Sequence, residues 1–215
     1  DYRWMMDISE NLMAKICLDL HGTMQIPYGD LKIDLTPPWK RLTIYDGLRK
    51  SLKIEPKTIG MDALQKLAKT HKVEGHTKGE ILLKLFDAVV GPTLTQPTFV
   101  MDYPSETSAL TKKHREDPEV TERFECVVAG MEVMNCYTEL NDPRDQRARF
   151  EGEKEKRARG DKEAMQFDED FLLFQEYGMP QQGGIGISID RWTMLLTNTQ
   201  RIRDVILFPL LKPEK

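Results

Sequence analysis

Apolar residues recur at helical spacing in the opening segment of the chain and alternate with polar residues soon afterwards. The helically spaced positions are Met5, Ile8, Leu12 and Ile16. We expect a helix over residues 1–20 that ends at Gly22. Two alternating runs then follow, at 23–28 and 31–35, with Gly29-Asp30 between them. This arrangement predicts a β-hairpin.

The remaining pattern predicts a sheet with helices that do not alternate with its strands. The expected strands are 39–44, 98–103, 123–130, 131–140 and 184–190. The expected helices are 62–69, 78–90, 144–159, 169–177 and one that begins near Arg191. Such an order favours an α+β sheet domain over a doubly wound fold. No Gly-rich dinucleotide motif or P-loop occurs, which excludes those nucleotide sites.

Two stretches stand apart from the sheet pattern. Residues 46–96 are Lys-rich and helical, and we interpret them as a helical insert without evident chemistry of its own. In the predicted helix 144–159, the pairs Glu153/Arg157 and Glu155/Arg159 are typical of a solvent-facing surface. The apolar run Val205–Pro209 predicts a buried strand or a docking tail.

Composition adds limits to this picture. The 215 residues are 40% apolar and 31% charged, a balance typical of a globular domain, and no apolar run is long enough to span a membrane. The formal charge of −4 gives no bulk attraction for nucleic acid, so contacts with RNA would need local basic patches. The three cysteines lack metal-ligand spacing and are expected to be buried thiols in a reducing compartment.

Carboxylates recur inside apolar strands over residues 123–142. Glu125, Glu132 and Glu139 lie in two predicted strands, where an isolated charge costs several kcal/mol. The pattern indicates that something positive meets them, either a ligand and a metal ion or neighbouring Lys and Arg side chains at a sheet edge.

Alternation places only part of this set on one face. Asn135, Tyr137 and Glu139 share a face, whereas Glu132 falls on the other. A β-bulge near Val133-Met134 would bring all four together, and we expect one there.

A second unusual stretch covers residues 183–197. Small residues at Gly184, Gly186 and Ser188 leave one strand face nearly bare, so that a flat ligand or another backbone can approach. Arg191 then stands where the strand gives way to a helix, a position suited to clamping a phosphate. Plain close packing would explain the glycines equally well.

Together these stretches resemble the class II aminoacyl-tRNA synthetases, and the lysyl-tRNA synthetases among them. GIGISIDR resembles the third class II motif, with Ser188 in place of its usual third glycine. RFECVVAGMEVMNCYTELNDPRDQ resembles the lysine-site segment, although Met131 replaces a common Arg, and Met134 and Cys136 replace glycines. PTFVMDYPSETSALTKKH, GDKEAMQFDEDFLLFQEYGMP and RIRDVILFP follow the same pattern in the same order.

The resemblance implies the groups that would handle ATP. Glu125 and Glu132 would hold Mg²⁺ against the phosphates. Gly184 and Gly186 would leave the strand face open to the nucleotide. Arg191 would hold the γ-phosphate, and as the catalytic residue it would stabilise the departing pyrophosphate.

It also implies the groups that would select lysine. Asn135 would position the lysine carboxylate, Tyr137 would wall the side-chain channel, and Glu139 would receive the ε-ammonium. A buried anion at the end of an apolar channel suits that cation, and a neutral analogue would leave the anion unpaired.

The fold expected from the resemblance is a class II synthetase-type antiparallel sheet flanked by helices, truncated at its N-terminus. Residues 1–215 would be the C-terminal part of the catalytic domain. We take the start at Asp1 to be a cut, with the first two class II motifs and the anticodon-binding domain absent from the chain. A whole enzyme of this kind would be a cytoplasmic homodimer that charges tRNA(Lys), while the chain alone would be inactive.

Three alternatives remain open at this point. A stand-alone relative that lysylates elongation factor P shares the lysine site. A non-catalytic module for regulation or assembly would bind without turnover. Aspartyl- and asparaginyl-tRNA synthetases share the fold, but Glu139 argues against an acidic amino acid.

Overall fold

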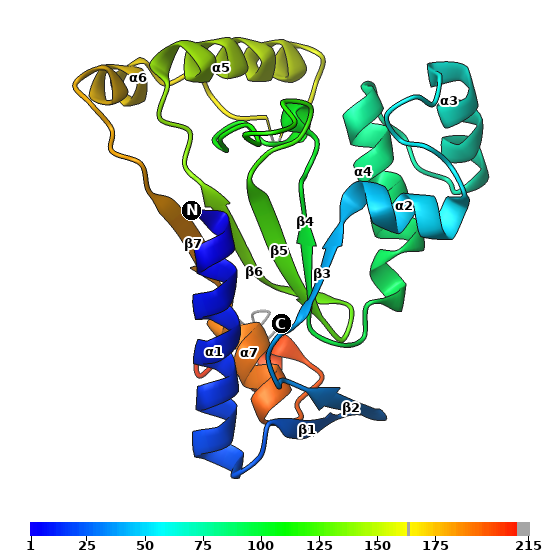
Figure 1. The fold of residues 1–215 in the computed structure, drawn as a ribbon, viewed down its shortest axis with the longest axis vertical. Coiled ribbons are helices and arrows are strands. Elements are labelled where there is room, and N and C mark those ends of the chain that lie inside the picture. Colours follow the sequence, from blue (N-terminus) through cyan, green and yellow to red (C-terminus); the bar gives the residue numbers. More distant parts are fainter. Residues whose placement is uncertain (163, 210–215) are drawn as a thin grey trace, which may run out of the picture.

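The main sheet of the protein has five strands in the order β3-β4-β5-β6-β7 (Figure 1). The computed structural model describes residues 1–162 and 164–209. The strands are β3 (Lys40–Thr43), β4 (Thr98–Met101), β5 (Arg123–Val128), β6 (Met131–Thr138) and β7 (Gly183–Ile187). All neighbours are antiparallel except β3 and β4, which run parallel. The expectation of an antiparallel sheet is therefore wrong at its β3 edge, where the helical insert supplies a crossover from one parallel strand to the other.

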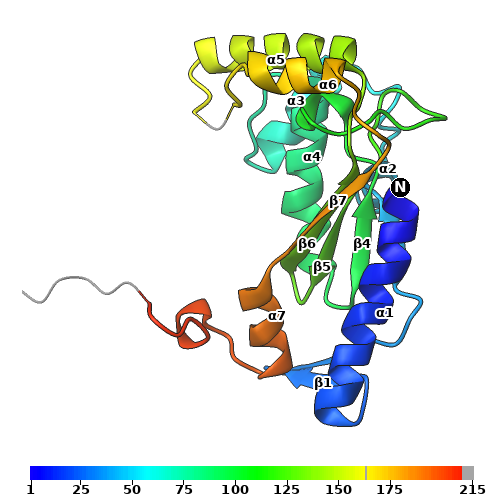
Figure 2. The ribbon, with the colours of Figure 1, turned by 90° about the vertical axis from the view of Figure 1, so that its left-hand side faces the viewer.

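Helix α1 (Tyr2–His21) covers one face of this sheet, and α4 (Lys78–Val89) lies on the opposite side (Figure 2). The Asp1 side chain caps α1, and Gly22 ends it in the left-handed region at φ 68°. Tyr2 and Met6 of α1 join Phe99 and Phe124 of the sheet in one buried cluster. The predicted first helix and its end at Gly22 are confirmed.

The insert forms a helical layer of its own over the β3–β4 half of the other face. It contains α2 (Ile44–Leu52), α3 (Met61–Thr70) and α4, which share a buried cluster with Leu42, Val100 and Tyr103 of the β3–β4 side. Helix α2 is not among the predicted helices. The Thr43 hydroxyl accepts a hydrogen bond from the Asp46 N–H, so the chain turns into a helix at Ile44, where the prediction continues the strand.

The other predicted elements occur close to their expected bounds. The hairpin of β1 (Gln25–Tyr28) and β2 (Leu31–Asp34) lies at one end of the molecule (Figure 1). Helices α5 (Pro143–Ala158) and α6 (Glu169–Glu176) lie at the other end. Helix α7 (Ile189–Leu196) follows β7, beginning two residues before Arg191.

Two surface details differ from the expected ones. On α5, Glu153 pairs with Lys156 at 2.8 Å, one residue before the expected Arg157. Near the end of the described chain, residues after the short η3 helix (Ile202–Asp204) form no buried strand, because Leu207 and Phe208 are 89% and 91% exposed. The docking-tail interpretation of this run stays a prediction.

The three cysteines are buried and unpaired, as expected. Burial raises the pKa of the Cys126 thiol, so it is an unreactive core group. Within 1–162 and 164–209, no helix has both the length and the apolar character needed to cross a bilayer.

Candidate active site

Strand β6 carries a β-bulge at the predicted place. Cys126 of β5 pairs with Met134, but Val127 pairs with Glu132, so Val133 is an extra residue in β6. Val133 and Met134 are consecutive and both buried, which reverses the alternation of the strand at that point. The predicted bulge near Val133-Met134 is confirmed, and it turns Glu132 to the face of Asn135.

The same face collects polar side chains from β5 and β6. Glu125 is paired with Asn135, and Arg123 is paired with Tyr137. On the far side of β6, Gly184 stands opposite Tyr137 and Gly186 stands opposite Asn135. The structure therefore brings together side chains that the sequence predicts for one site.

Two of the three glutamates have a cationic neighbour within the chain. Arg123 Nη2 lies 2.6 Å from a carboxylate oxygen of Glu125, and Arg191 Nη1 lies 3.8 Å from one of Glu132. For these two the alternative of simple pairing with arginine holds in part. Glu139 makes no ion pair with any residue of the described ranges.

Glu139 occupies a half-buried position at the end of β6. Its backbone N–H donates to the Gln182 carbonyl at 2.9 Å, which ties it to the segment before β7. Burial raises the pKa of its carboxyl, and its charge in turn helps to raise the pKa of Tyr137 after desolvation. An anion without a partner beside an aromatic ring is suited to a cationic ligand.

Arg191 lies in the first turn of α7 and lines a cavity of about 300 Å³. The Ser188 hydroxyl accepts a hydrogen bond from the Arg191 N–H at 3.3 Å and caps the helix. Nη1 of Arg191 donates to the backbone carbonyl of Glu132. Asn135 and Gly186 line the same cavity, so the guanidinium, an amide and a bare strand share one concavity.

A second cavity, of about 510 Å³, adjoins Glu125 and Glu132. Asp87 of α4 also lines it, although the insert was expected to carry no chemistry. Desolvation raises the pKa of Asp87 to about 6, and the neighbouring Glu125 contributes to the rise. Desolvation, with Glu125 next, also raises the pKa of Glu132. Negative charge is therefore in excess here.

The carboxylate oxygens of Glu125 and Glu132 could bind Mg²⁺ only together with further ligands, such as water or phosphate oxygens. Within the described residues no group of three or more His, Cys, Asp or Glu side chains could hold a metal ion. Mg²⁺ commonly takes one or two carboxylates and completes its shell with water and substrate phosphates. Glu125 and Glu132 would supply two such carboxylates.

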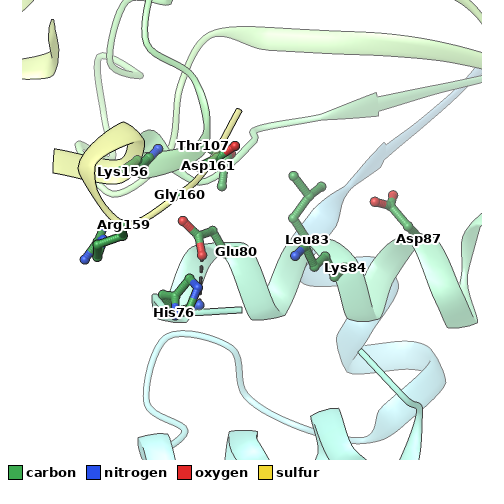
Figure 3. Close-up of a pocket in the computed structure, with 10 residues that line it drawn as sticks. All are labelled: His76, Glu80, Leu83, Lys84, Asp87, Thr107, Lys156, Arg159, Gly160 and Asp161. Atoms are coloured by element: carbon green, nitrogen blue, oxygen red, sulfur yellow. Dashed lines mark hydrogen bonds between the residues drawn. The ribbon is translucent and has the colours of Figure 1, made fainter. Parts of the chain in front are cut away.

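A further cavity, of about 550 Å³, lies between α4 and the end of α5 (Figure 3). Asp87 lines this cavity as well, at the far end of α4 from His76. Glu80 accepts a hydrogen bond from the His76 N–H at 2.9 Å. The Lys84 ammonium donates to the Glu74 carbonyl at 2.6 Å, which links α4 to the loop before it.

Sequence reasoning missed two groups of the site. The sequence pattern marks Arg123 only as the start of a strand, although alternation with Glu125 places both side chains on the polar face. Asp87 gave no local signal, because a polar residue on an amphipathic helix is normally a solvent-facing one.

Comparisons with known proteins agree with this architecture. The family of class II tRNA synthetases (D, K and N) matches residues 1–212, and the chain belongs to this family. The chain is 44% identical to a lysine--tRNA ligase of Thermoanaerobacter sp. strain X514, over 100% of this chain and 44% of the relative. It is 47% identical to that of Clostridium acetobutylicum, over 99% and 43%, and 43% identical to that of Synechococcus sp. strain CC9311, over 100% and 45%. The chain thus spans less than half the length of these relatives.

Proposed function

We propose that this chain provides the lysine-selecting and metal-holding part of the active site of a lysine–tRNA ligase. The reaction would join the lysine carboxylate to the α-phosphate of ATP as an adenylate, with release of pyrophosphate, and would then transfer lysine to tRNA(Lys), with release of AMP. The observation that carries the proposal is Glu139, a half-buried carboxylate with a raised pKa beside Tyr137. The relatives named lysine--tRNA ligase support the same amino acid and a tRNA acceptor.

The lysine side of the site follows from charge and spacing along β6. Glu139 would receive the ε-ammonium, since it has an uncompensated charge. Tyr137 would line the channel for the methylene chain. Asn135, two residues before Tyr137 on the same face, would bind the carboxylate of lysine.

The ATP side follows from the cavity beside β7. Arg191 would bind the γ-phosphate, and Gly186 leaves room for the nucleotide above the strand. Glu125 and Glu132 would hold Mg²⁺, which supplies positive charge against the phosphate oxygens when bound. Adenylate formation needs no nucleophile from the protein, because the lysine carboxylate itself attacks the α-phosphate once both are held in line.

The remaining expectations belong to the same proposal. Residues 1–215 would act as the C-terminal part of a catalytic domain, together with segments that account for the rest of the relatives' length. The whole enzyme would be a homodimer in the cytoplasm, and buried reduced thiols are typical of that compartment.

Calorimetric titration of the 215-residue chain with each standard amino acid tests the binding step. We expect lysine alone to bind, and Glu139→Gln to abolish the binding. Glu151→Gln, an exposed glutamate on α5, is the matched control and should bind lysine normally. Binding of a different amino acid, or of lysine equally well by Glu139→Gln, would overturn the lysine assignment.

A graft tests the chemistry. The chain would replace the matching segment of the Clostridium acetobutylicum relative, and lysine-dependent ATP–pyrophosphate exchange would be measured. Exchange by the graft, with none by the isolated chain, is expected. No exchange from a folded graft, or turnover by the isolated chain, would contradict the proposal.

A further inference from the structure

One guanidinium lies between the two halves of the proposed site. Arg123 Nη2 donates to Glu125 at 2.6 Å, and Arg123 Nε donates to Asn135 Oδ1 at 3.2 Å. The proposed metal ligand and the proposed carboxylate-binding amide are therefore tied to a single side chain.

The guanidinium is itself held from two other directions. Its Nη1 donates to the hydroxyl of Ser108 at 3.0 Å. Its carbon lies 4.4 Å from the centre of the Tyr103 ring, in a cation–π contact. The Arg123 side chain is only 17% exposed. Its four neighbours together fix its orientation.

Donor chemistry then decides which way the Asn135 amide faces. An arginine side chain has donors and no acceptor, so only the carbonyl oxygen of Asn135 can meet it. The amide NH₂ must point away from Arg123. An NH₂ group can donate to a carboxylate, whereas the carbonyl oxygen would repel one.

We propose that Arg123 is a positioning residue for the selection of lysine over amines that lack a carboxylate. It turns the Asn135 amide so that its donor side faces the substrate carboxylate. This inference rests on the proposed function, because it assigns Asn135 to that carboxylate.

A merely structural role for Arg123 would have a different signature. Loss of packing or charge would weaken every ligand of the site alike. Loss of amide orientation weakens only ligands that carry the carboxylate. Lysine and cadaverine, the amine that lysine becomes without its carboxylate, separate these two cases.

Arg123→Lys is the test variant, because it keeps the charge, but its single nitrogen cannot reach the three acceptors that Arg123 contacts through three separate nitrogens. Titration calorimetry of the 215-residue chain should show that lysine binds about ten-fold more weakly, while cadaverine binds as in the wild type. Asn135→Ala should give the same pattern, and the double variant should show no further loss. Arg147→Lys, an arginine of the exposed α5 surface paired with Glu169, is the matched control.

The possible outcomes separate the two proposals. If Arg123→Lys weakens both ligands equally, or neither, the positioning role is wrong. If Arg123→Lys and Asn135→Ala add their effects in the double variant, the two residues act independently and the role is again wrong. If the wild-type chain is folded and binds neither ligand, the proposed lysine site fails, and the inference falls with it.

Discussion

The carboxylate of Glu139 lies against Gly184, in the space that a side chain at position 184 would fill. The register places Tyr137 opposite Gly184, and Glu139 follows two residues later on the same face. The missing side chain at position 184 therefore makes room for the Glu139 carboxylate. At Gly186 the nearest atom to an added Cβ is the Asn135 carbonyl oxygen, at 3.8 Å, so that position is open.

Gly184→Ala is expected to displace the Glu139 carboxylate and weaken lysine binding about ten-fold, with little change in the free energy of unfolding, because only the flexible end of the Glu139 side chain has to move. Gly186→Ala makes the same chemical change two residues along the strand and should leave stability close to the wild type. Titration calorimetry and urea unfolding measure the two effects. Equal lysine affinity in Gly184→Ala and wild type would show that the Glu139 position is unimportant.

Glu139→Gln is expected to stabilise the chain at neutral pH while it abolishes lysine binding. Burial raises the pKa of Glu139 above that of the unfolded chain. The cost of burying the ionised Glu139 carboxylate is absent below the pKa of the unfolded chain, about 4.3. The chain loses stability as pH rises from there through the folded pKa. Urea unfolding at pH 4 and pH 7 should show a gain only at pH 7. A loss of stability at pH 7 would mean that the charge has a cationic partner.

Part of this site was predictable because β-strands follow parity. The side chains of Asn135, Tyr137 and Glu139 alternate with buried neighbours, so their common face follows from the sequence. Strict alternation would place Glu132 on the opposite face from Asn135, and a β-bulge is needed to bring the two side chains to one face. The bulge at Val133 could therefore be predicted from the positions of the polar residues.

The remaining features depend on contacts between distant segments. The parallel pairing of β3 with β4 joins strands on either side of the insert, and no local pattern specifies it. Asp87 reaches the carboxylates of β5 and β6 only because α4 packs on the sheet. The missed helix α2 depends on a cap at Thr43, which a strand-like run of apolar residues concealed.

Asp87 is expected to titrate near pH 6, well above an ordinary aspartate. Desolvation and the charges of Glu125 and Glu132 raise its pKa to about 6, against the opposing effect of Arg123. The stability associated with its protonated form is present below about pH 4 and lost as pH rises through about 6. Carbon-detected NMR titration of the side-chain carboxyl measures the pKa directly. Glu125→Gln should lower it, whereas a wild-type value near 4 would show that the insert does not sense the site.

Arg41→Met is expected to destabilise the chain by about 3 kcal/mol, because it leaves a buried charge without its cation. Glu10 of α1 is 4% exposed; one of its oxygens lies 3.1 Å from Arg41, and the other accepts the Trp39 N–H at 2.7 Å. Adding Glu10→Gln removes the charge and keeps an acceptor for Trp39, so the double variant should be more stable than Arg41→Met alone. Lys15→Met breaks an exposed pair with Asp19 on the same helix and should cost at most about 0.5 kcal/mol. Urea unfolding of the wild type and these three variants measures the differences in stability. A double variant no more stable than Arg41→Met would show that the lost cation–π contact between the Arg41 guanidinium and the Phe99 ring matters more than the unpaired charge.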